Sequence, residues 1–512
     1  MDDELKLKTD AVTLFILQPV SRQRQWVSPQ SMWNACLCVW IGYWGAVGGA
    51  THAAAPTQQE LDSQKRYVAR LADGTYRAGF YLTPWQAADE PLALDQQPLS
   101  DHANPWRWIL DRTVPESDPP QSFVQLVNGD CLPGRVVGYV GANTNSKAPI
   151  PAHYLVEPAV EIGEPGGSTL QRVRVVARYV QTIAWARRSV DRVEPATLFL
   201  RRGQPIRFQS ARVDAAQIQL LVDTGIQTVP LHQVAELHLS APDAWTSYFS
   251  EHLTLDKTVS AAWFQMETSK QLRVTGLLSK TNLVLADGPD RSVRWIPGVQ
   301  TAWCLERLWT RDGLPRIRRV WPADSVPVSR FVTAERRQAV LLPERGAPFR
   351  VDRNVQGGPL RSGSHDFGWG LGVHAPSDLV IPLHPCVIGL QTGFGLDSSV
   401  GSHGCVRARI HIAPPPSTDQ PLFEGHVLVG SEHTVETGLL NISPAHTNSK
   451  LVLQADPVSL DPPRGADPLD IRDRANWLDP VLKLDRQQVQ RAIQDLEQSS
   501  GDGQRNQLPP RR

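Results

Sequence analysis

The chain has 512 residues with 52 basic and 52 acidic side chains, so its formal net charge is zero. Without a basic stripe, nucleic acid is excluded as an expected partner, because a phosphate backbone attracts clustered Lys and Arg. The length predicts two to four domains. The 42 Pro fit many loops, and the 16 Trp fit either core anchors or rings that stack on sugars.

An apolar stretch over residues 35–50 precedes small residues that end at Pro56, with two arginines upstream. This is the pattern of a secretory signal. We therefore expect residues 1–55 to be an N-terminal extension and signal, cleaved near residue 53 or 54. The product would be secreted or periplasmic, with no stable membrane span. An uncleaved membrane anchor and a translation start at Met32 instead of Met1 stay open as alternatives.

Residues 62–310 show a weak internal repetition in which each unit begins with a strand, a tight turn and a second strand. The three openings are Tyr67–Phe80, Phe123–Val137 and Leu198–Phe208, and matching later parts are Tyr179–Ile183, His232–Leu237 and Gly298–Ala302. Asp73-Gly74 and Asn128-Gly129 are hairpin-turn sequences. We predict two to four small all-β units, bent sheets or SH3-sized barrels, that pack on one another. No catalytic motif occurs in them, so a spacer or interaction platform is expected.

Residues 311–330 are punctuated by Gly and Pro and are predicted to be a linker. The next segment, 331–485, contains many short β-type runs, which predict a sandwich or barrel. These runs are 379–383, 387–390, 406–412, 427–429, 439–442 and 451–453. The last segment, 486–512, predicts a short helix over Arg486–Leu496 and a disordered tail from Ser499.

Three motifs stand in order within the 331–485 segment: Gly370-Leu371-Gly372-Val373-His374, then Phe394-Gly395-Leu396-Asp397, then the residues from Asp473 to Asp479. Together they resemble the NPCBM domain, carbohydrate-binding module family 51, first noticed beside family 98 glycoside hydrolases. The resemblance implies a jelly-roll-like β-sandwich whose loops at one end bind a glycan, with galactose-containing glycans as candidates. The expected fold class is all-β, with small β-rich repeats before the sandwich.

The resemblance also implies sugar-contacting residues: Trp477, His374, Asp473 and Asn476. An exposed indole can stack on a pyranose while neighbouring polar groups bond its hydroxyls. Each residue has a structural alternative, since Trp477 can fill the core and His374 can bond nearby backbone.

Calcium is the one cofactor considered, with Asp397 and Asp456 as candidate ligands, because hard cations bind carboxylate oxygens. The alternative for both carboxylates is capping of turns.

A second motif, Gly401-Ser402-His403-Gly404-Cys405-Val406-Arg407, resembles the nucleophile signature of L,D-transpeptidases, with Cys405 as the attacking thiolate. That family's upstream His is not matched at the expected spacing. The same residues suit a Gly-rich turn followed by a strand with Val406, Ala408, Ile410 and Ile412 on one face. Enzyme activity is therefore unsupported, and the main alternative to sugar binding is an envelope scaffold or protein-interaction role.

Four cysteines lie outside the predicted signal: Cys131, Cys304, Cys386 and Cys405. They have no CxxC spacing, so zinc has no support. A disulfide between Cys386 and Cys405 and burial of all four thiols both stay open.

Overall fold

The computed structural model describes residues 65–505 except 83–91, 100–102, 113–119, 144–148, 164–168, 189–192, 241–242, 279–295, 311–315, 333, 337–347, 364, 368, 415–419, 444–448, 459–462 and 468–469. The predicted signal lies outside the described residues, so its cleavage stays a prediction. Within the described residues, no helix is long and apolar enough to cross a bilayer.

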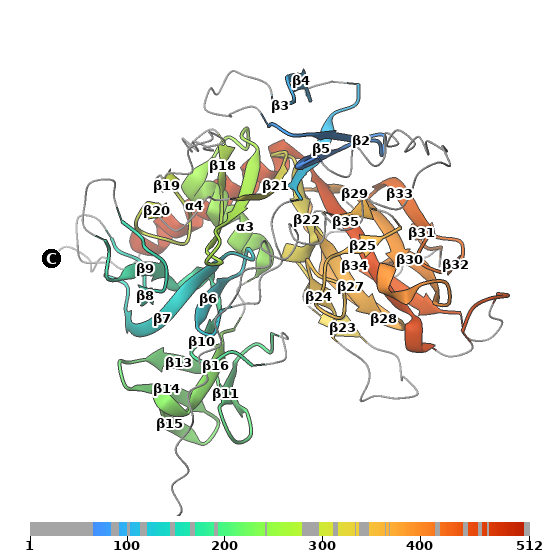
Figure 1. Cartoon of the computed structure of the whole chain (residues 1–512). Coiled ribbons are helices and arrows are strands. Elements are labelled where there is room, and N and C mark those ends of the chain that lie inside the picture. Colours follow the sequence, from blue (N-terminus) through green and yellow to red (C-terminus); the bar gives the residue numbers. More distant parts are fainter. Residues whose placement is uncertain are drawn as a thin grey trace, which may run out of the picture. The chain divides into compact units, whose positions relative to one another are not determined.

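Residues 65–321 form strands and one long helix (Figure 1). The elements are β1 Tyr67–Leu71, β2 Tyr76–Gly79, β3 Ala93–Leu94, β4 Gln97–Pro98, β5 Trp106–Asp111, β6 Phe123–Leu126, β7 Cys131–Val140, β8 His153–Pro158, β9 Val173–Val176, β10 Val180–Ala184, β11 Thr197–Leu200, β12 Ile206–Arg207, β13 Ser210–Val213, β14 Gln217–Val222, β15 Gly225–Pro230, β16 Val234–His238, α3 Ala244–Leu255, β17 Trp263–Glu267, β18 Arg273–Leu277, β19 Ile296–Val299, β20 Leu308–Thr310 and β21 Arg316–Trp321. Most of these strands join one 14-stranded sheet whose main path is β12-β11-β16-β10-β6-β7-β18-β17-β21-β5-β1-β2.

Two small units within this region close in the same way. In the first, β6 to β10, the last strand pairs back onto the first, and in the second, β11 to β16, β16 pairs back onto β11. In each unit a 3-10 turn, Ala177–Tyr179 or Leu231–Gln233, stands directly before the last strand. Pairing of β10 with β16 joins the two units. The predicted openings Phe123–Val137 and Leu198–Phe208 lie at the start of these two units.

Helix α3 was not predicted, because its aromatic and β-branched residues are typical of strands. Asp243 caps its first turn by accepting a hydrogen bond from the Thr246 backbone N–H at 2.7 Å. Trp245 stacks on Phe331 with ring centroids 4.2 Å apart and donates its indole N–H to the carbonyl of Pro382 at 3.0 Å. Tertiary packing against the C-terminal part of the chain therefore overrides local propensity here.

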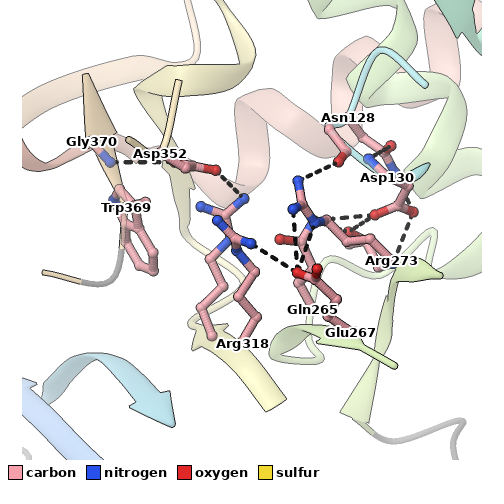
Figure 2. Close-up of polar contacts among 12 residues, drawn as sticks. Asn128, Asp130, Gln265, Glu267, Arg273, Arg318, Asp352, Trp369 and Gly370 are labelled. Atoms are coloured by element: carbon pink, nitrogen blue, oxygen red, sulfur yellow. Dashed lines mark hydrogen bonds and ion pairs between the residues drawn. The ribbon is translucent and has the colours of Figure 1, made fainter. Parts of the chain in front are cut away.

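The β6–β7 turn carries a fully buried carboxylate, Asp130, which is surrounded by donors (Figure 2). It accepts hydrogen bonds from Asn128 Nδ2, Gln265 Nε2, Thr275 N, Thr275 Oγ1 and Trp303 Nε1, at 2.6–3.2 Å. These donors come from its own turn, from the β17–β18 hairpin and from the segment after β19. One buried charge thus fixes three segments far apart in sequence, because an unpaired buried carboxylate would be strongly destabilising.

The C-terminal part is a β-sandwich that ends in a helix. Its elements are β22 Ser325–Pro327, β23 Ala334–Arg336, β24 Arg350–Val351, β25 Arg361–Ser362, β26 His365–Asp366, β27 Gly370–His374, β28 Ser377–Pro382, β29 Val387–Leu396, β30 Cys405–Ala413, β31 Phe423–Glu424, β32 Leu428–Val429, β33 Thr434–Asn441, β34 Lys450–Pro457, β35 Arg474–Leu484 and α4 Arg486–Arg505. One sheet has the strand order β24-β27-β35-β29-β33, and β22 also pairs with β35. The other sheet has the strand order β23-β28-β34-β30-β31, and β32 also pairs with β30.

The two sheets enclose a single apolar core. In β30, Val406, Ala408, Ile410 and Ile412 are buried and alternate with partly exposed residues, as the sequence predicts. The all-β fold class is confirmed, with a jelly-roll-like sandwich after the β-rich units (Figure 1).

Two predicted segments are wrong. The described part of the predicted linker, residues 316–330, is not a linker, because β21 pairs with β17 and β22 pairs with β35 of the sandwich. Turn residues between paired strands have the same Gly and Pro composition as a linker. The predicted disordered tail is also shorter, since α4 continues to Arg505 and buries Val489 and Ile493 in the sandwich core.

Buried charges and aromatic rings hold the sandwich to the β-rich region. Arg319 Nη2 of β21 pairs with Asp352 Oδ2 at 2.9 Å, and Asp352 Oδ1 accepts from the Gly370 N–H at 3.3 Å (Figure 2). Beside this pair, the Trp369 ring meets the ring of Trp108 in β5 with centroids 6.0 Å apart. Residues 65–505 therefore behave as one compact unit.

Asp479, on β35, is buried at this junction, and its backbone N–H donates to the Trp369 carbonyl at 3.0 Å. Burial raises the pKa of Asp479 to about 7, although the Arg107 and Arg70 guanidinium groups oppose the rise and Glu436 adds to it. Arg70 Nη2 itself pairs with Glu436 Oε1 at 2.6 Å. The Asp479 carboxyl group at the junction therefore stays uncharged at pH values below about 7.

We predict that Asp479 makes the fold less stable as pH rises from about 4 to 7. A folded-state pKa above the unfolded value means that the folded chain binds this proton more tightly, so raising the pH favours unfolding by up to about 4 kcal/mol. Asp479→Asn should remove that dependence. Urea unfolding of both proteins at pH 5 and pH 8 measures it, and an equal pH dependence in wild type and variant would contradict the prediction.

Candidate functional site at one end of the sandwich

Strand register brings several loops to the same end of the sandwich. His374 at the end of β27 pairs with Arg474 at the start of β35, and Leu396 at the end of β29 pairs with Ala475. The start of β33, Thr434, pairs with Gly395. The loops that follow or precede these positions must therefore converge, because antiparallel neighbours begin and end at a common edge.

Four segments, which we call the loop end, make up this surface: 353–363, 397–404, 430–434 and the described residues of 463–474, which leave out 468 and 469. Hydrogen bonds connect them in a ring of contacts. Ser399 Oγ donates to Gln356 Oε1 at 3.0 Å, the Gly363 N–H to the Ser431 carbonyl at 2.7 Å, the Ser431 N–H to the Gly401 carbonyl at 2.8 Å, and the Asp467 N–H to the His403 carbonyl at 2.8 Å. The loop end is thus a connected polar surface.

Asp397 and Asn476 lie beneath this surface and organise it. Asp397 Oδ1 accepts from the Ser399 N–H at 3.0 Å, and its Oδ2 accepts from Asn476 Nδ2 at 2.9 Å. Asn476 Nδ2 also donates to the Arg361 carbonyl at 3.3 Å. Both side chains are almost completely buried, so they position the loops and do not reach a ligand themselves.

Glycines of the family motifs allow this arrangement. A Cβ on Gly372 would collide with the backbone of Arg353 and Asn354, and a Cβ on Gly395 would lie 2.9 Å from the Ser362 Cβ. The 353–363 segment can therefore lie flat across β27 and β29 only where these strands carry no side chain.

The prediction that Trp477 presents an exposed ring is wrong. Its side chain is 0% exposed and packs on Phe394 with ring centroids 4.6 Å apart inside the core. Because the indole fills the core, Trp477→Ala is expected to destabilise the sandwich by about 3–5 kcal/mol and not to remove a sugar contact.

The other predicted contacts also serve the fold. His374 donates Nδ1–H to the carbonyl of Ala375 at 2.8 Å, which is the backbone role given as its alternative. Asp473 is buried and accepts from the Cys405 N–H at 2.8 Å, so it caps the start of β30.

The predicted metal ligands are not brought together. Asp397 belongs to the loop end, whereas Asp456 on β34 pairs with Arg409 Nη1 at 2.7 Å on the other sheet. In the described part of the chain, no three His, Cys, Asp or Glu side chains form a group that could hold a metal. These carboxylates instead bond turns and arginines, and calcium binding stays a prediction without a defined site.

The four cysteines outside the signal are unbonded thiols, so the Cys386–Cys405 disulfide is not formed. The transpeptidase alternative is contradicted by the environment of Cys405. Burial raises the pKa of its thiol to about 11, and the Asp473 carboxylate adds to this effect. An attacking cysteine needs a lowered pKa and an accessible sulfur, and Cys405 is 2% exposed.

Cys405 should therefore resist alkylation in the folded protein. At pH 8 a thiol with this pKa is about 0.1% thiolate, and burial blocks the reagent as well. Labelling with iodoacetamide, read by mass spectrometry with and without urea, should modify Cys405 only after unfolding. Rapid labelling of the native protein would contradict this.

The exposed side chains of the loop end were missed by sequence reasoning. They include Gln356, Ser402, His403, Glu432 and His433. The signal that could have found them is their position in Gly- and Ser-rich turns that flank the recognised motifs. None of the four segments contains Phe, Trp or Tyr, so this surface offers hydrogen bonds and not aromatic stacking.

Comparison with known proteins matches part of the chain to a protein family. Residues 342–483 match the family model described as the NPCBM/NEW2 domain. Among solved structures, the chain is similar to CBM51 from Clostridium perfringens GH95 in complex with methyl-galactose, with 15% identity, coverage of 31% of this chain and 99% of that chain, and a TM-score of 0.25. It is also similar to the CBM51-2 and INT domains from Clostridium perfringens ZmpB, with 16% identity, 31% coverage of each chain and a TM-score of 0.25.

A third similar structure is the M60 catalytic domain with the CBM51-1 and CBM51-2 domains from Clostridium perfringens ZmpB. It has 12% identity and a TM-score of 0.25, and covers 82% of this chain and 51% of that chain. No curated protein matches. The family match confirms the recognised resemblance over residues 342–483.

Proposed function

We propose that the protein is exported and binds a glycan non-catalytically through the loop end of its sandwich. The observation that carries the proposal is the connected polar surface that four segments build within the region matching the NPCBM/NEW2 family. Export rests on the signal-like residues 35–55. Galactose-containing glycans are the first ligands to test, as the family resemblance implies.

The loop end should bind sugar weakly. Hydroxyl groups of a sugar would be bonded by side chains such as Gln356 and His403, and each such bond contributes about 0.5–1.5 kcal/mol. Three or four bonds without aromatic stacking correspond to a dissociation constant of about 1 mM. Stable retention on a polysaccharide would then require several binding sites that act together.

The test is saturation-transfer NMR of the full chain against a panel of galactosides and other glycans, with and without calcium. Gln356→Ala and His403→Ala should each weaken binding about five- to tenfold, because each removes one hydrogen bond. Lys450→Ala is the matched control, since this exposed residue starts β34 at the opposite end of the sandwich. No signal from any glycan, or equal weakening by the control, would overturn the proposal and favour the scaffold role.

A further inference from the structure

The β1–β2 hairpin of the β-rich region contacts the sandwich beside the loop end. Arg70 Nη2 on β1 pairs with Glu436 Oε1 on β33 at 2.6 Å. The Tyr76 ring on β2 stacks on the ring of His365, with centroids 4.9 Å apart and planes 16° from parallel. Arg70 also lies over Tyr76, with its Cζ 4.2 Å from the ring centroid. One hairpin thus reaches two separate elements of the sandwich through two side chains that contact each other.

Both contacted elements adjoin segments of the loop end. His365 belongs to the β25–β26 hairpin, in which the 353–363 segment ends. Glu436 lies two residues beyond the 430–434 segment, on the strand that this segment begins. A backbone hydrogen bond also joins the two segments to each other. A displacement of either contacted element would therefore be passed on to the loop end.

The sandwich sheets hold these two elements weakly. β25 and β26 pair with each other in a two-stranded sheet, and an isolated hairpin is only marginally stable. β33 is the outermost strand of its sheet, and its pairing with β29 shifts register between Gln391 and Gly393. Such a bulge separates the start of β33 from the rest of the ladder. The β1–β2 hairpin adds contacts where the sheets give few.

The contact with β33 is well shielded from water. The Arg70 side chain is 6% exposed, whereas Glu436 is 38% exposed. The turn of the β1–β2 hairpin lies against this arginine, since a Cβ on Gly74 would be 3.5 Å from Arg70 Nη2. An edge of the Trp108–Tyr76 ring pair, with centroids 6.4 Å apart, packs behind it. Because a buried guanidinium is costly without a partner, this arrangement holds Glu436 in place.

We propose that the β1–β2 hairpin positions segments 353–363 and 430–434 of the loop end, with Tyr76 and Arg70 as positioning residues. The β-rich region is then part of the glycan site and not a spacer. Both side chains act through the loops and do not contact a ligand themselves. The effect on sugar affinity rests on the proposed function, whereas the effect on the loops does not.

Native-state hydrogen exchange of the full chain tests the positioning. Tyr76→Leu keeps an apolar side chain and removes the ring stack, so the backbone N–H groups of Gly363 and Ser431 should exchange about three- to tenfold faster. Amides of the central strand β30 should keep their rates. Tyr139→Leu is the matched control, because Tyr139 is also a half-buried tyrosine of the β-rich region, and its ring packs on Tyr154 with centroids 5.3 Å apart. It should leave all these amides unchanged.

Glu436→Gln tests the second contact independently. The substitution keeps the size of the side chain and removes the charge that pairs with Arg70, so the Ser431 amide should exchange about two- to threefold faster. Loop amides that keep their wild-type rates in both variants would overturn the proposal. An equal rise in β30 or in the Tyr139→Leu control would overturn it as well.

Saturation-transfer NMR with methyl galactoside, or with whichever panel glycan binds wild type, gives the second readout. The double variant Tyr76→Leu/Glu436→Gln should weaken binding about fivefold, because the loops are no longer held in the binding geometry. Faster loop exchange with unchanged affinity would overturn the link to the site. If no glycan binds wild type, the proposed function fails, and the exchange rates still decide whether the hairpin positions the loops.

Discussion

The architecture depends on the need to give a buried charged group hydrogen-bonding partners. Asp130 satisfies that need with donors from three segments, and it can do so only if the β6–β7 turn, the β17–β18 hairpin and Trp303 are all in place. Glu267 lies two residues after Gln265 on β17 and binds Arg318 Nη1 at 2.9 Å. The adjacent Arg319 binds Asp352 of the sandwich. Polar contacts thus extend from the small units to the sandwich.

The same principle operates at the loop end on a smaller scale. The buried Asp397–Asn476 bond holds the loops from below, and polar groups above it stay exposed. Because the loops are joined to one another by hydrogen bonds and not by packing of large side chains, their surface is polar.

Local sequence patterns predicted much of the secondary structure. The Asp73-Gly74 and Asn128-Gly129 hairpins form, with positive φ at both glycines, because few other residues adopt that conformation. The alternation of residues in the sequence correctly predicted which side chains of β30 face the core. Local patterns failed at α3 and at residues 316–330, where packing of Trp245 on Phe331 and pairing of β22 with β35 decide the structure.

The sequence by itself determined the all-β class, the hairpin turns and the match of residues 342–483 to the NPCBM/NEW2 family model, since these depend on residues close together in the chain. Only the tertiary structure decided which motif residues face outward. Trp477 and Asn476 have the chemistry of a sugar site, but strand pairing turns both inward, and Gln356 and His403 take the surface instead. Side-chain direction depends on register and on the partner strand, which no local pattern specifies.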